Sequence, residues 1–228
     1  MDLSKRLQAV ADLISPDMSV ADVGTDHGYI PIYLIKSGKS PKAIAMDINE
    51  GPLLRAKAHI ESYHLYIETR LSDGAHALQP GEVDCVVIAG MGGALTIKIL
   101  EEGKVVFRAL KEFVLQPQSE LWKVREYLMS HGYQIIQEDM ILEDGKFYPM
   151  MKVINRDSEE YNNVELHYGP LLLKQKHPIL KLFLEKEMNK KNGILHNLKQ
   201  ESGTNIRLRE KEIKQELEAI SYALQRYY

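Results

Sequence analysis

The stretch from Val20 to Pro31, VADVGTDHGYIP, places two carboxylates and two glycines around one tight turn. An apolar strand ends next to Asp22, and the segment from Gly28 to Ile35 has the pattern of the helix that follows. Glycines permit left-handed backbone or the close approach of a ligand, and the first turn of a helix has unpaired N–H groups. Together these features are typical of a nucleotide-cofactor loop.

The charge of this turn indicates the class of ligand. The dinucleotide fingerprint G-x-G-x-x-G is absent, because the spacing is Gly24-Thr25-Asp26-His27-Gly28. Asp22 and Asp26 would repel a pyrophosphate, whereas they favour a ligand with an amino group and a sulfonium cation, such as S-adenosylmethionine. A nicotinamide oxidoreductase therefore ranks low. For this segment alone, an acidic turn without a ligand is the alternative.

Two further strands are predicted to end in carboxylates. The strand from Lys42 to Ile48 ends at Asp47, roughly 20 residues beyond the glycine turn, where a carboxylate can accept hydrogen bonds from both ribose hydroxyls. Asn49 is the expected N-cap of the next helix. After a short strand, Asp73 follows in Ser72-Asp73-Gly74 and could accept from an adenine amino group, although a plain Asx turn has the same sequence.

A fourth strand, from Val83 to Ile88, is followed by Ala89-Gly90-Met91-Gly92-Gly93, a loop with few side-chain atoms. Such a loop allows another group to approach its backbone closely. The carboxyl ends of parallel strands lie at one edge of the sheet, so we expect the four loops to form one site.

These residues resemble the class I S-adenosylmethionine-dependent methyltransferases and, within them, the bacterial tRNA (adenine-22-N1)-methyltransferase family. The resemblance covers the first two thirds of the chain and rests on SKRL (4–7), DVGTDHGYIP (22–31), Asp47, SDG (72–74), IAGMGG (88–93), LQPQ (115–118) and EDGKFY (143–148). The general superfamily pattern has a glycine where this chain has Asp26.

The resemblance and the residues together define a predicted site. The expected cofactor-binding residues are Asp22, Gly24, Thr25, Gly28, Asp47, Ile48, Asp73, Gly74 and Gly90. The expected substrate-binding residues are Arg6, Tyr29, Met91, Gly92 and Gly93. For Tyr29 packing against the sheet is the alternative, and for Arg6 it is a surface ion pair.

The expected reaction is methyl transfer to N1 of an adenine in tRNA. N1 has a lone pair, so the reaction needs orientation and an environment that tolerates the cationic product rather than a base. We predict Asp26 and His27 as the catalytic residues, with a structural role in the turn as the alternative for either. Methylation of the exocyclic N6 is disfavoured, because an Asn/Asp-Pro-Pro-Tyr/Phe motif does not follow the fourth strand.

The predicted fold is α/β, with a Rossmann-like methyltransferase domain in residues 1–155 and a helical coiled-coil extension in residues 156–228. The sheet continues with a strand at 112–115 and a helix at 121–129, and runs at 133–142 and 147–154 read as a hairpin. A mostly parallel seven-stranded sheet with an antiparallel edge hairpin follows.

In the extension, helical patterns at 171–199 and 206–227 flank Glu201-Ser202-Gly203-Thr204-Asn205 and predict a helical hairpin. The second segment carries a heptad stripe of Ile206, Ile213, Leu217, Ile220 and Leu224. The extension has 13 Lys and Arg against 11 Asp and Glu. A basic face of Lys174, Lys176, Lys181, Lys190 and Lys191 is a candidate phosphate contact, and a simple packing appendage is the alternative.

Composition indicates a soluble globular protein of 228 residues, 44% hydrophobic, with net charge −3. Cys85 is the single cysteine, which excludes an intrachain disulfide and favours the cytoplasm. The amphipathic N-terminal segment does not resemble a signal peptide, and no apolar run reaches membrane-spanning length. Because the histidines lack cysteine partners at zinc spacing, and His59 and His64 lack the i, i+4 placement, we expect no metal.

Two other functions remain open from the sequence. One is a methyltransferase of the same fold that acts on another RNA or a small molecule. The other is a noncatalytic module that binds the cofactor or a helical partner. We expect a monomer, with dimerisation through the helices as the alternative.

Overall fold

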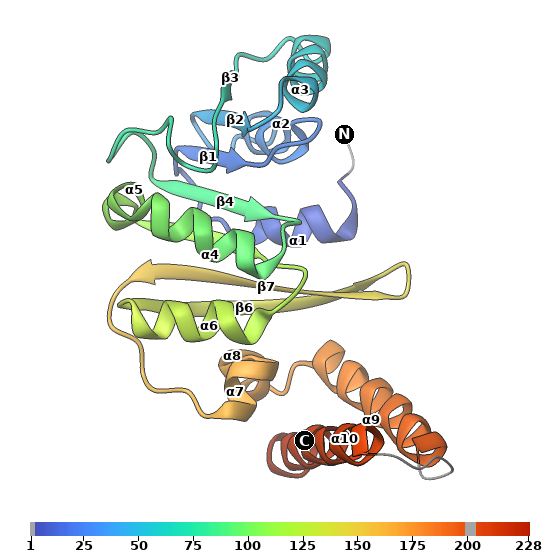
Figure 1. The fold of residues 1–228 in the computed structure, drawn as a ribbon. Helices are drawn as coiled ribbons and strands as arrows, with labels where there is room; N and C mark the ends of the chain where they lie inside the picture. Colours follow the sequence, from blue (N-terminus) through green and yellow to red (C-terminus); the bar gives the residue numbers. More distant parts are fainter. Residues whose placement is uncertain (1–2, 199–203) are drawn as a thin grey trace. The chain divides into compact units, whose positions relative to one another are not determined.

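A mostly parallel β-sheet forms the centre of the N-terminal part of the protein (Figure 1). The structure is a computed structural model that describes residues 3–198 and 204–228. Within these residues the sheet has seven strands in the order β3-β2-β1-β4-β5-β7-β6. Strands β1 to β5 pair in parallel, whereas β7 is antiparallel to both β5 and β6. The predicted Rossmann-like sheet with an antiparallel edge hairpin is confirmed.

The chain divides into two units, Met1–Glu160 and Tyr161–Tyr228. The strands of the first unit are β1 (Val20–Val23), β2 (Ala43–Asp47), β3 (Glu68–Leu71), β4 (Cys85–Ala89), β5 (Glu112–Gln116), β6 (Tyr133–Glu143) and β7 (Lys146–Asn155). Its helices are α1 (Lys5–Leu13), α2 (Tyr29–Lys36), α3 (Glu50–Ser62), α4 (Gly93–Glu102), α5 (Lys104–Ala109) and α6 (Leu121–Ser130). The second unit contains α7 (Asn163–Tyr168), α8 (Pro170–Lys174), α9 (Pro178–Leu198) and α10 (Thr204–Tyr227).

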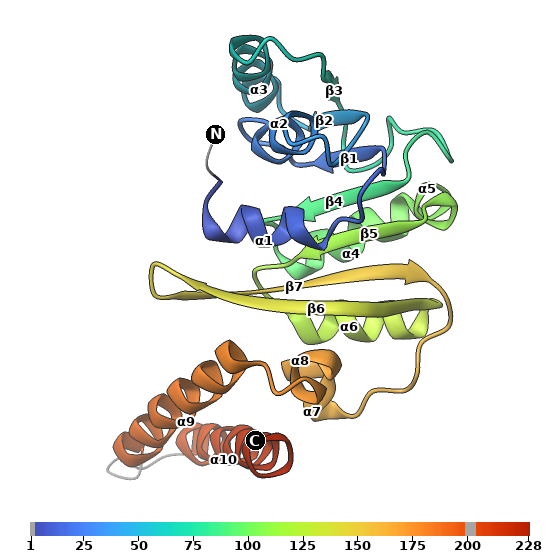
Figure 2. The same cartoon turned by 180° about the vertical axis from the view of Figure 1, so that it is seen from behind.

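Helices cover both faces of the sheet. Figures 1 and 2 show α4, α5 and α6 on one face and α1 on the other. Val10 of α1 and Leu34 of α2 belong to the same buried cluster as Val87 of β4. Ile32 of α2 and Ile60 of α3 share a second cluster with strand β2. Burial of this apolar surface on both faces explains why the inner strands are continuous hydrophobic runs.

The register of the strands aligns their carboxyl ends. Val23 pairs with Met46 of β2 and with Ile88 of β4, and Ala89 pairs with Gln116 of β5. The loops after these strands therefore begin at one edge of the sheet, as the sequence predicts for a single site.

The structure refines one local prediction and contradicts another. Asn49 occupies the predicted N-cap position of α3, but its side chain makes no capping bond. Its backbone N–H instead donates to Oδ1 of Asp47 at 2.8 Å, so the strand-end carboxylate orders the turn. The helical pattern at 171–199 forms two helices, because Lys176 has φ +53° and Pro178, which cannot donate an N–H, begins the second.

The second unit contains an antiparallel pair of long helices. Helices α9 and α10 pack together, and Ile213, Ile220 and Ala223 of α10 are fully buried. Thus two members of the predicted heptad stripe lie in the core of this unit. Residues 201–203 of the predicted loop lie outside the described residues. Thr204 and Asn205, which the prediction also assigns to the loop, belong to α10.

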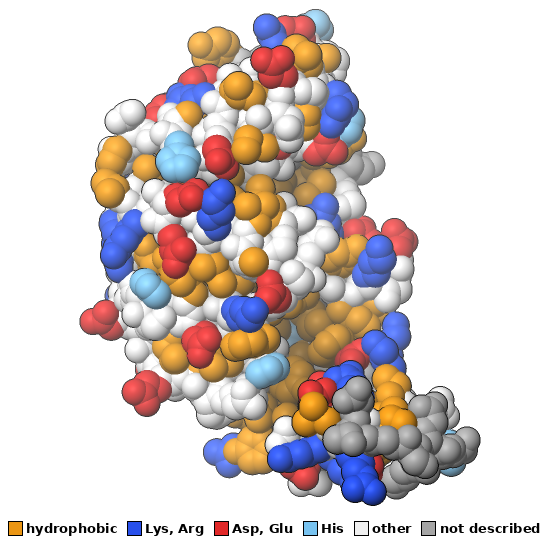
Figure 3. Space-filling view, viewed as in Figure 1, with side chains coloured by type: hydrophobic (Ala, Val, Ile, Leu, Met, Phe, Trp, Pro, Cys, Tyr) orange, Lys and Arg blue, Asp and Glu red, His pale blue; other side chains and the backbone are white. Residues whose placement is uncertain are grey.

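Three of the five lysines in the predicted basic face have carboxylate partners in the same unit. Lys181 lies 4.0 Å from Glu185 and Lys190 lies 3.6 Å from Glu187, while Lys191 contacts both Glu187 and Glu216. These pairs favour a solvated charged face over a phosphate contact. On the face of the first unit seen in Figure 3, acidic and basic side chains are likewise interspersed. In the described part of the chain, no helix is long and apolar enough to cross a membrane.

Candidate active site

The turn after β1 is fixed by backbone bonds to the neighbouring strand. Gly24 has φ +79°, and the N–H groups of Gly24 and Thr25 both donate to the carbonyl oxygen of Met46 at 2.8 Å. Gly28, with φ +68°, is the N-cap residue of α2. Both glycines adopt the left-handed conformation that other residues rarely adopt, which accounts for their spacing.

The Asp22 side chain is buried at the end of β1, with 6% of the residue exposed. Burial raises the pKa of this carboxyl to about 6, and the charge of Asp47 adds to the rise. The neighbouring Thr25 side chain and the positive charge of Arg6 lower the pKa and so oppose part of this rise. The carboxylate is therefore held in an environment where a cationic ligand would stabilise its charged form.

Asp26 lies in the same turn, but its side chain is 66% exposed. Arg55 of α3 holds Oδ1 of this carboxylate with its Nη2 at 2.7 Å and its Nε at 3.3 Å. The Nε2 atom of His27 lies 3.7 Å from Oδ2. The structure brings the two predicted catalytic residues together. It adds Arg55, which the sequence analysis missed because its pairing with Asp26 spans 29 residues.

Aromatic and imidazole rings form a row beside this turn. The rings of His27 and Tyr29 stack with centroids 5.3 Å apart, and His59 meets Tyr29 edge-on at 5.2 Å. The Nδ1 atom of His59 also contacts the carbonyl oxygen of His27 at 2.8 Å. Tyr29 is 40% exposed, so part of this side chain stays accessible to a ligand.

A cavity of about 330 Å³ opens at the carboxyl edge of the sheet. Seven predicted site residues line it, namely Arg6, Asp22, Gly24, Thr25, Asp26, Tyr29 and Gly90. Gln118 also lines it and was absent from the predicted set. The cavity thus joins acidic groups, a guanidinium, an aromatic ring and a carboxamide.

Residues of the motifs EDGKFY (143–148) and LQPQ (115–118) position Arg6. The carboxylate of Glu143 accepts from the backbone N–H of Lys5 at 2.6 Å and from that of Arg6 at 3.3 Å, at the start of α1. The Nη1 atom of Arg6 donates to Oε1 of Gln116 at 3.0 Å, and its guanidinium lies 5.7 Å from the ring centre of Tyr148. A surface ion pair, the alternative for Arg6, is replaced by this amide and ring contact.

The remaining predicted cofactor residues lie along the same edge but do not line the cavity. The carbonyl oxygen of Asp47 accepts from the N–H of Ser72 at 2.8 Å, which joins the loops after β2 and β3. Ile48 is 57% exposed beside them. Asp73 and Gly74 follow directly, and Gly74 has φ +55°. Their contact with a cofactor stays a prediction.

The glycine loop after β4 is more tightly packed than expected. The N–H of Gly93 donates to Oγ of Ser119 at 3.2 Å, and a Cβ on Gly93 would stand 2.5 Å from the carbonyl oxygen of Ser119. A Cβ on Gly92 would stand 3.3 Å from the same hydroxyl. The start of α4 therefore packs against the loop after β5, and Ser119 is a group that approaches this glycine backbone closely. The expected substrate contact of Gly92 and Gly93 stays a prediction. The side chain of Met91 lies over Gly24.

We expect Gly93→Ala to lower the free energy of unfolding by about 1–3 kcal/mol, because its Cβ meets backbone that has to move. Urea unfolding followed by circular dichroism measures the loss. Gly51→Ala in helix α3 is the matched control, since its Cβ would have only a 3.7 Å contact with Arg55. It should be neutral or stabilising. Equal stability of Gly93→Ala and wild type would contradict the packing explanation.

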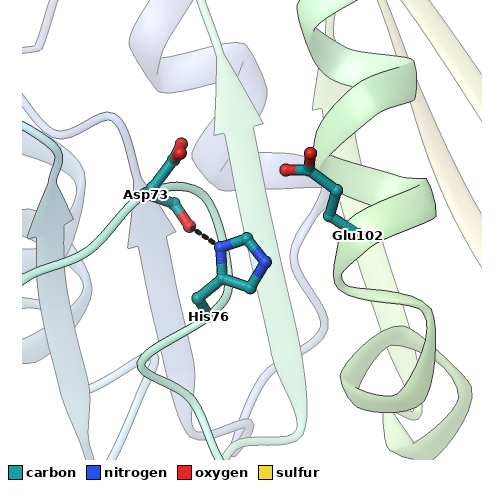
Figure 4. A group of neighbouring side chains, drawn as sticks. All are labelled: Asp73, His76 and Glu102. Carbon is teal, nitrogen blue, oxygen red and sulfur yellow. Dashed lines mark hydrogen bonds between the residues drawn. The ribbon is translucent and has the colours of Figure 1, made fainter.

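One cluster among the described residues has the composition of a metal site. Ligand atoms of Asp73, His76 and Glu102 lie within 4.8 Å of one another, and all three residues are exposed. Figure 4 shows Glu102 reaching from α4 toward the loop that carries the other two, with Nδ1 of His76 bonded to the carbonyl oxygen of Asp73 at 2.8 Å. Exposed groups of this kind are common without an ion. The expectation of no metal stays a prediction.

Comparisons with known proteins place the chain among methyltransferases. A methyltransferase-domain family model matches residues 3–151. The tRNA (adenine(22)-N(1))-methyltransferase of Bacillus subtilis is 36% identical over 211 residues, which cover 90% of this chain and 89% of that protein.

Solved structures of similar proteins match almost the whole chain, and two of them illustrate the likeness. The crystal structure of the B. subtilis M1A22 tRNA methyltransferase TrmK has a TM-score of 0.86 and 32% identity, covering 97% of this chain and 98% of that one. The structure of Mycoplasma capricolum TrmK in complex with S-adenosyl-homocysteine has a TM-score of 0.86 and 29% identity, covering 99% of each. With a methyltransferase sheet and an acidic cavity at its carboxyl edge, the chain belongs to the tRNA (adenine(22)-N(1))-methyltransferase family.

Proposed function

We propose that this protein transfers a methyl group from S-adenosylmethionine to N1 of adenine 22 in tRNA. The observation that carries the proposal is the cavity of about 330 Å³ in which Asp22 and Asp26 lie with Tyr29, in a chain of this family. Buried and exposed carboxylates suit a cationic donor, and an open aromatic ring suits a nucleobase.

The residues at the sheet edge fit S-adenosylmethionine, which supplies an electrophilic methyl group when bound. Gly24 and Gly28 give the turn its left-handed backbone, and the buried carboxylate of Asp22 suits the amino group of the donor. Asp47 suits the ribose hydroxyls, while Ile48, Asp73 and Gly74 suit the adenine ring. Thr25 and Gly90 complete this proposed set.

The chain's own contribution to the reaction is electrostatic and geometric. Methylation gives the target adenine a positive charge, and the carboxylate of Asp26 lies in the cavity to stabilise it. Arg55 fixes the direction of that carboxylate, and His27 orients the base beside it. Because the N1 lone pair attacks directly, none of these residues has to remove a proton.

Access to N1 requires the target nucleotide to leave its stack in the folded tRNA, at a cost of a few kcal/mol. The ring of Tyr29 would offer the base a new contact at the cavity, which Arg6 also lines. The end of the Met91 side chain lies next to Gly24 in the same wall. The substrate places the enzyme in the cytoplasm, where tRNA is modified. The helical extension stays a candidate tRNA-binding element.

The test uses labelled S-adenosylmethionine with unmodified bacterial tRNA transcripts and with matched transcripts in which adenine 22 is replaced by guanine. We expect label at N1 of adenine 22 and none in the replaced transcripts. Label that persists in the guanine transcripts would indicate another target, and cofactor binding without label on any tRNA would refute the proposed substrate.

A further inference from the structure

Gln118 presents a carboxamide to the cavity from a rigid loop. Its backbone N–H donates to the carbonyl oxygen of Met91 at 2.8 Å, and the preceding Pro117 is buried. Its Nε2 atom lies 3.7 Å from the point that a Cβ on Gly90 would occupy. Within residues 3–198 and 204–228, no hydrogen bond is found for this amide group. The backbone is thus fixed while both polar atoms of the amide remain available to a ligand.

The wall next to Gln118 is also polar and fixed. Gln116, which is 1% exposed, accepts from Arg6 through Oε1. The guanidinium of Arg6 also lies 5.7 Å from the ring centre of Tyr148, so its contacts are with Gln116 and Tyr148 rather than with the Gln118 amide. Gln118 therefore lines the same cavity as Asp26 and Tyr29, and no side-chain hydrogen bond is found for it among the described residues.

The geometry of methylation at N1 limits how an adenine can be recognised. The N1 atom has to face the methyl donor, so the edge that carries N6 and N7 is the one left for the protein. On that edge the N6 amino group donates a hydrogen bond and N7 accepts one, and a carboxamide matches both at once. Guanine presents two acceptors, O6 and N7, and an amide oxygen would face O6 without a proton between them.

We propose that Gln118 selects adenine by accepting from N6 and donating to N7 of the target base. The inference rests on the proposed function. It assigns Gln118 a share in the rate as well, because charge that develops on the ring during methylation spreads to N6. The N6–H then becomes a stronger donor, so its bond to the amide oxygen tightens in the transition state.

The test combines changes in the enzyme with removal of N7 from the substrate. Ligated tRNA carrying 7-deazaadenine at position 22 keeps N6 but replaces N7 by C–H. For the wild type we expect this to lower kcat/KM about tenfold, the size of one lost base-edge hydrogen bond. Gln118→Met loses both bonds, so it should lose up to about 100-fold on natural tRNA. Removal of N7 from the substrate should then cost this variant nothing further.

Gln118→Glu provides the sharper arm, because its carboxylate can still accept from N6 but faces the N7 lone pair with a negative charge. We expect its preference to invert, with the 7-deaza substrate methylated faster than the natural one. Gln137→Met, at an exposed position on β6, is the control for the same chemical change. It should retain the wild-type preference.

If Gln118→Met and the 7-deaza substrate each lower kcat/KM by the same factor together as they do separately, the assignment is wrong. It is also wrong if Gln118→Met only weakens cofactor binding and still depends on N7 as the wild type does. Failure of the wild type to methylate natural tRNA would refute the proposed function and this assignment with it. The two failures can be told apart. The assignment of Gln118 can fail only if the wild type methylates natural tRNA, whereas the proposed function fails if it does not.

Discussion

Asp22→Asn makes the ligand-free protein more stable above pH 7 and weakens its binding of S-adenosylmethionine about tenfold or more. We expect this result because the Asp22 carboxyl is buried and its pKa is raised to about 6. An amide keeps the shape but removes the charge that burial penalises. The same change removes the anion that suits the cationic donor, and a lost charge-assisted hydrogen bond costs about 1.5–3 kcal/mol.

The pH dependence has a defined sign. Between pH 3.8, the ordinary pKa of the carboxyl, and about 6, its folded-state pKa, the folded protein holds a proton at Asp22 that the unfolded chain has lost. The free energy of unfolding therefore falls as the pH rises through this window, by about 3 kcal/mol in all from this group. Asp22→Asn should remove this slope, so the two proteins converge near pH 4.

Urea unfolding at pH 4, 6 and 8 and calorimetric titration with the cofactor measure the two effects. Asp84→Asn is the control with the opposite sign. Lys111 and Ser19 bond to the Asp84 carboxylate and lower its pKa to about 2, so its amide variant should be less stable at pH 8. Asp22→Asn that is less stable than wild type at pH 8 would contradict the burial argument.

Asp26→Ala should lower kcat on tRNA about 100-fold while the dissociation constant for S-adenosylmethionine changes little. Removal of one preorganised charge from a site where charge develops has an effect of this size. The side chain is 66% exposed and packs little, so the loss of stability should be small. Arg55→Met should give a partial loss of kcat, because the carboxylate remains but is no longer held.

Single-turnover kinetics with saturating cofactor isolate this effect from binding. Asp12→Ala provides the matched control, since Asp12 is an exposed residue on α1 whose carboxylate accepts from Gln8 and does not line the cavity. It should retain the wild-type rate. A full rate with Asp26→Ala would show that Asp26 has no catalytic role.

The sequence allowed the fold to be predicted because its signals are local. Each inner strand is a short apolar run that ends in a polar loop, and parallel pairing then brings Asp22 and Asp47 to one edge without further information. Gly24 and Gly28 were recognisable for the same reason, since their left-handed backbone is a local requirement.

The errors and omissions concern contacts between distant segments. Position 93 requires a glycine because Ser119 approaches its backbone. The residues next to Gly93 in the sequence do not reveal this contact. Arg55 lies on an exposed helix face, and only the folded chain brings it to Asp26. Gln118 belongs to a motif that supported the resemblance, but its role depends on a cavity formed by four other segments.

A single carbonyl group sets the spacing of the proposed cofactor contacts. The oxygen of Met46 receives both N–H groups of the turn after Asp22, and Met46 directly precedes Asp47 on the same strand. The sheet, rather than a mobile loop, therefore fixes the interval between the two carboxylates. A donor whose amino acid chain is longer by one methylene would therefore have to adopt a bent conformation or lose its contact with one of the two carboxylates.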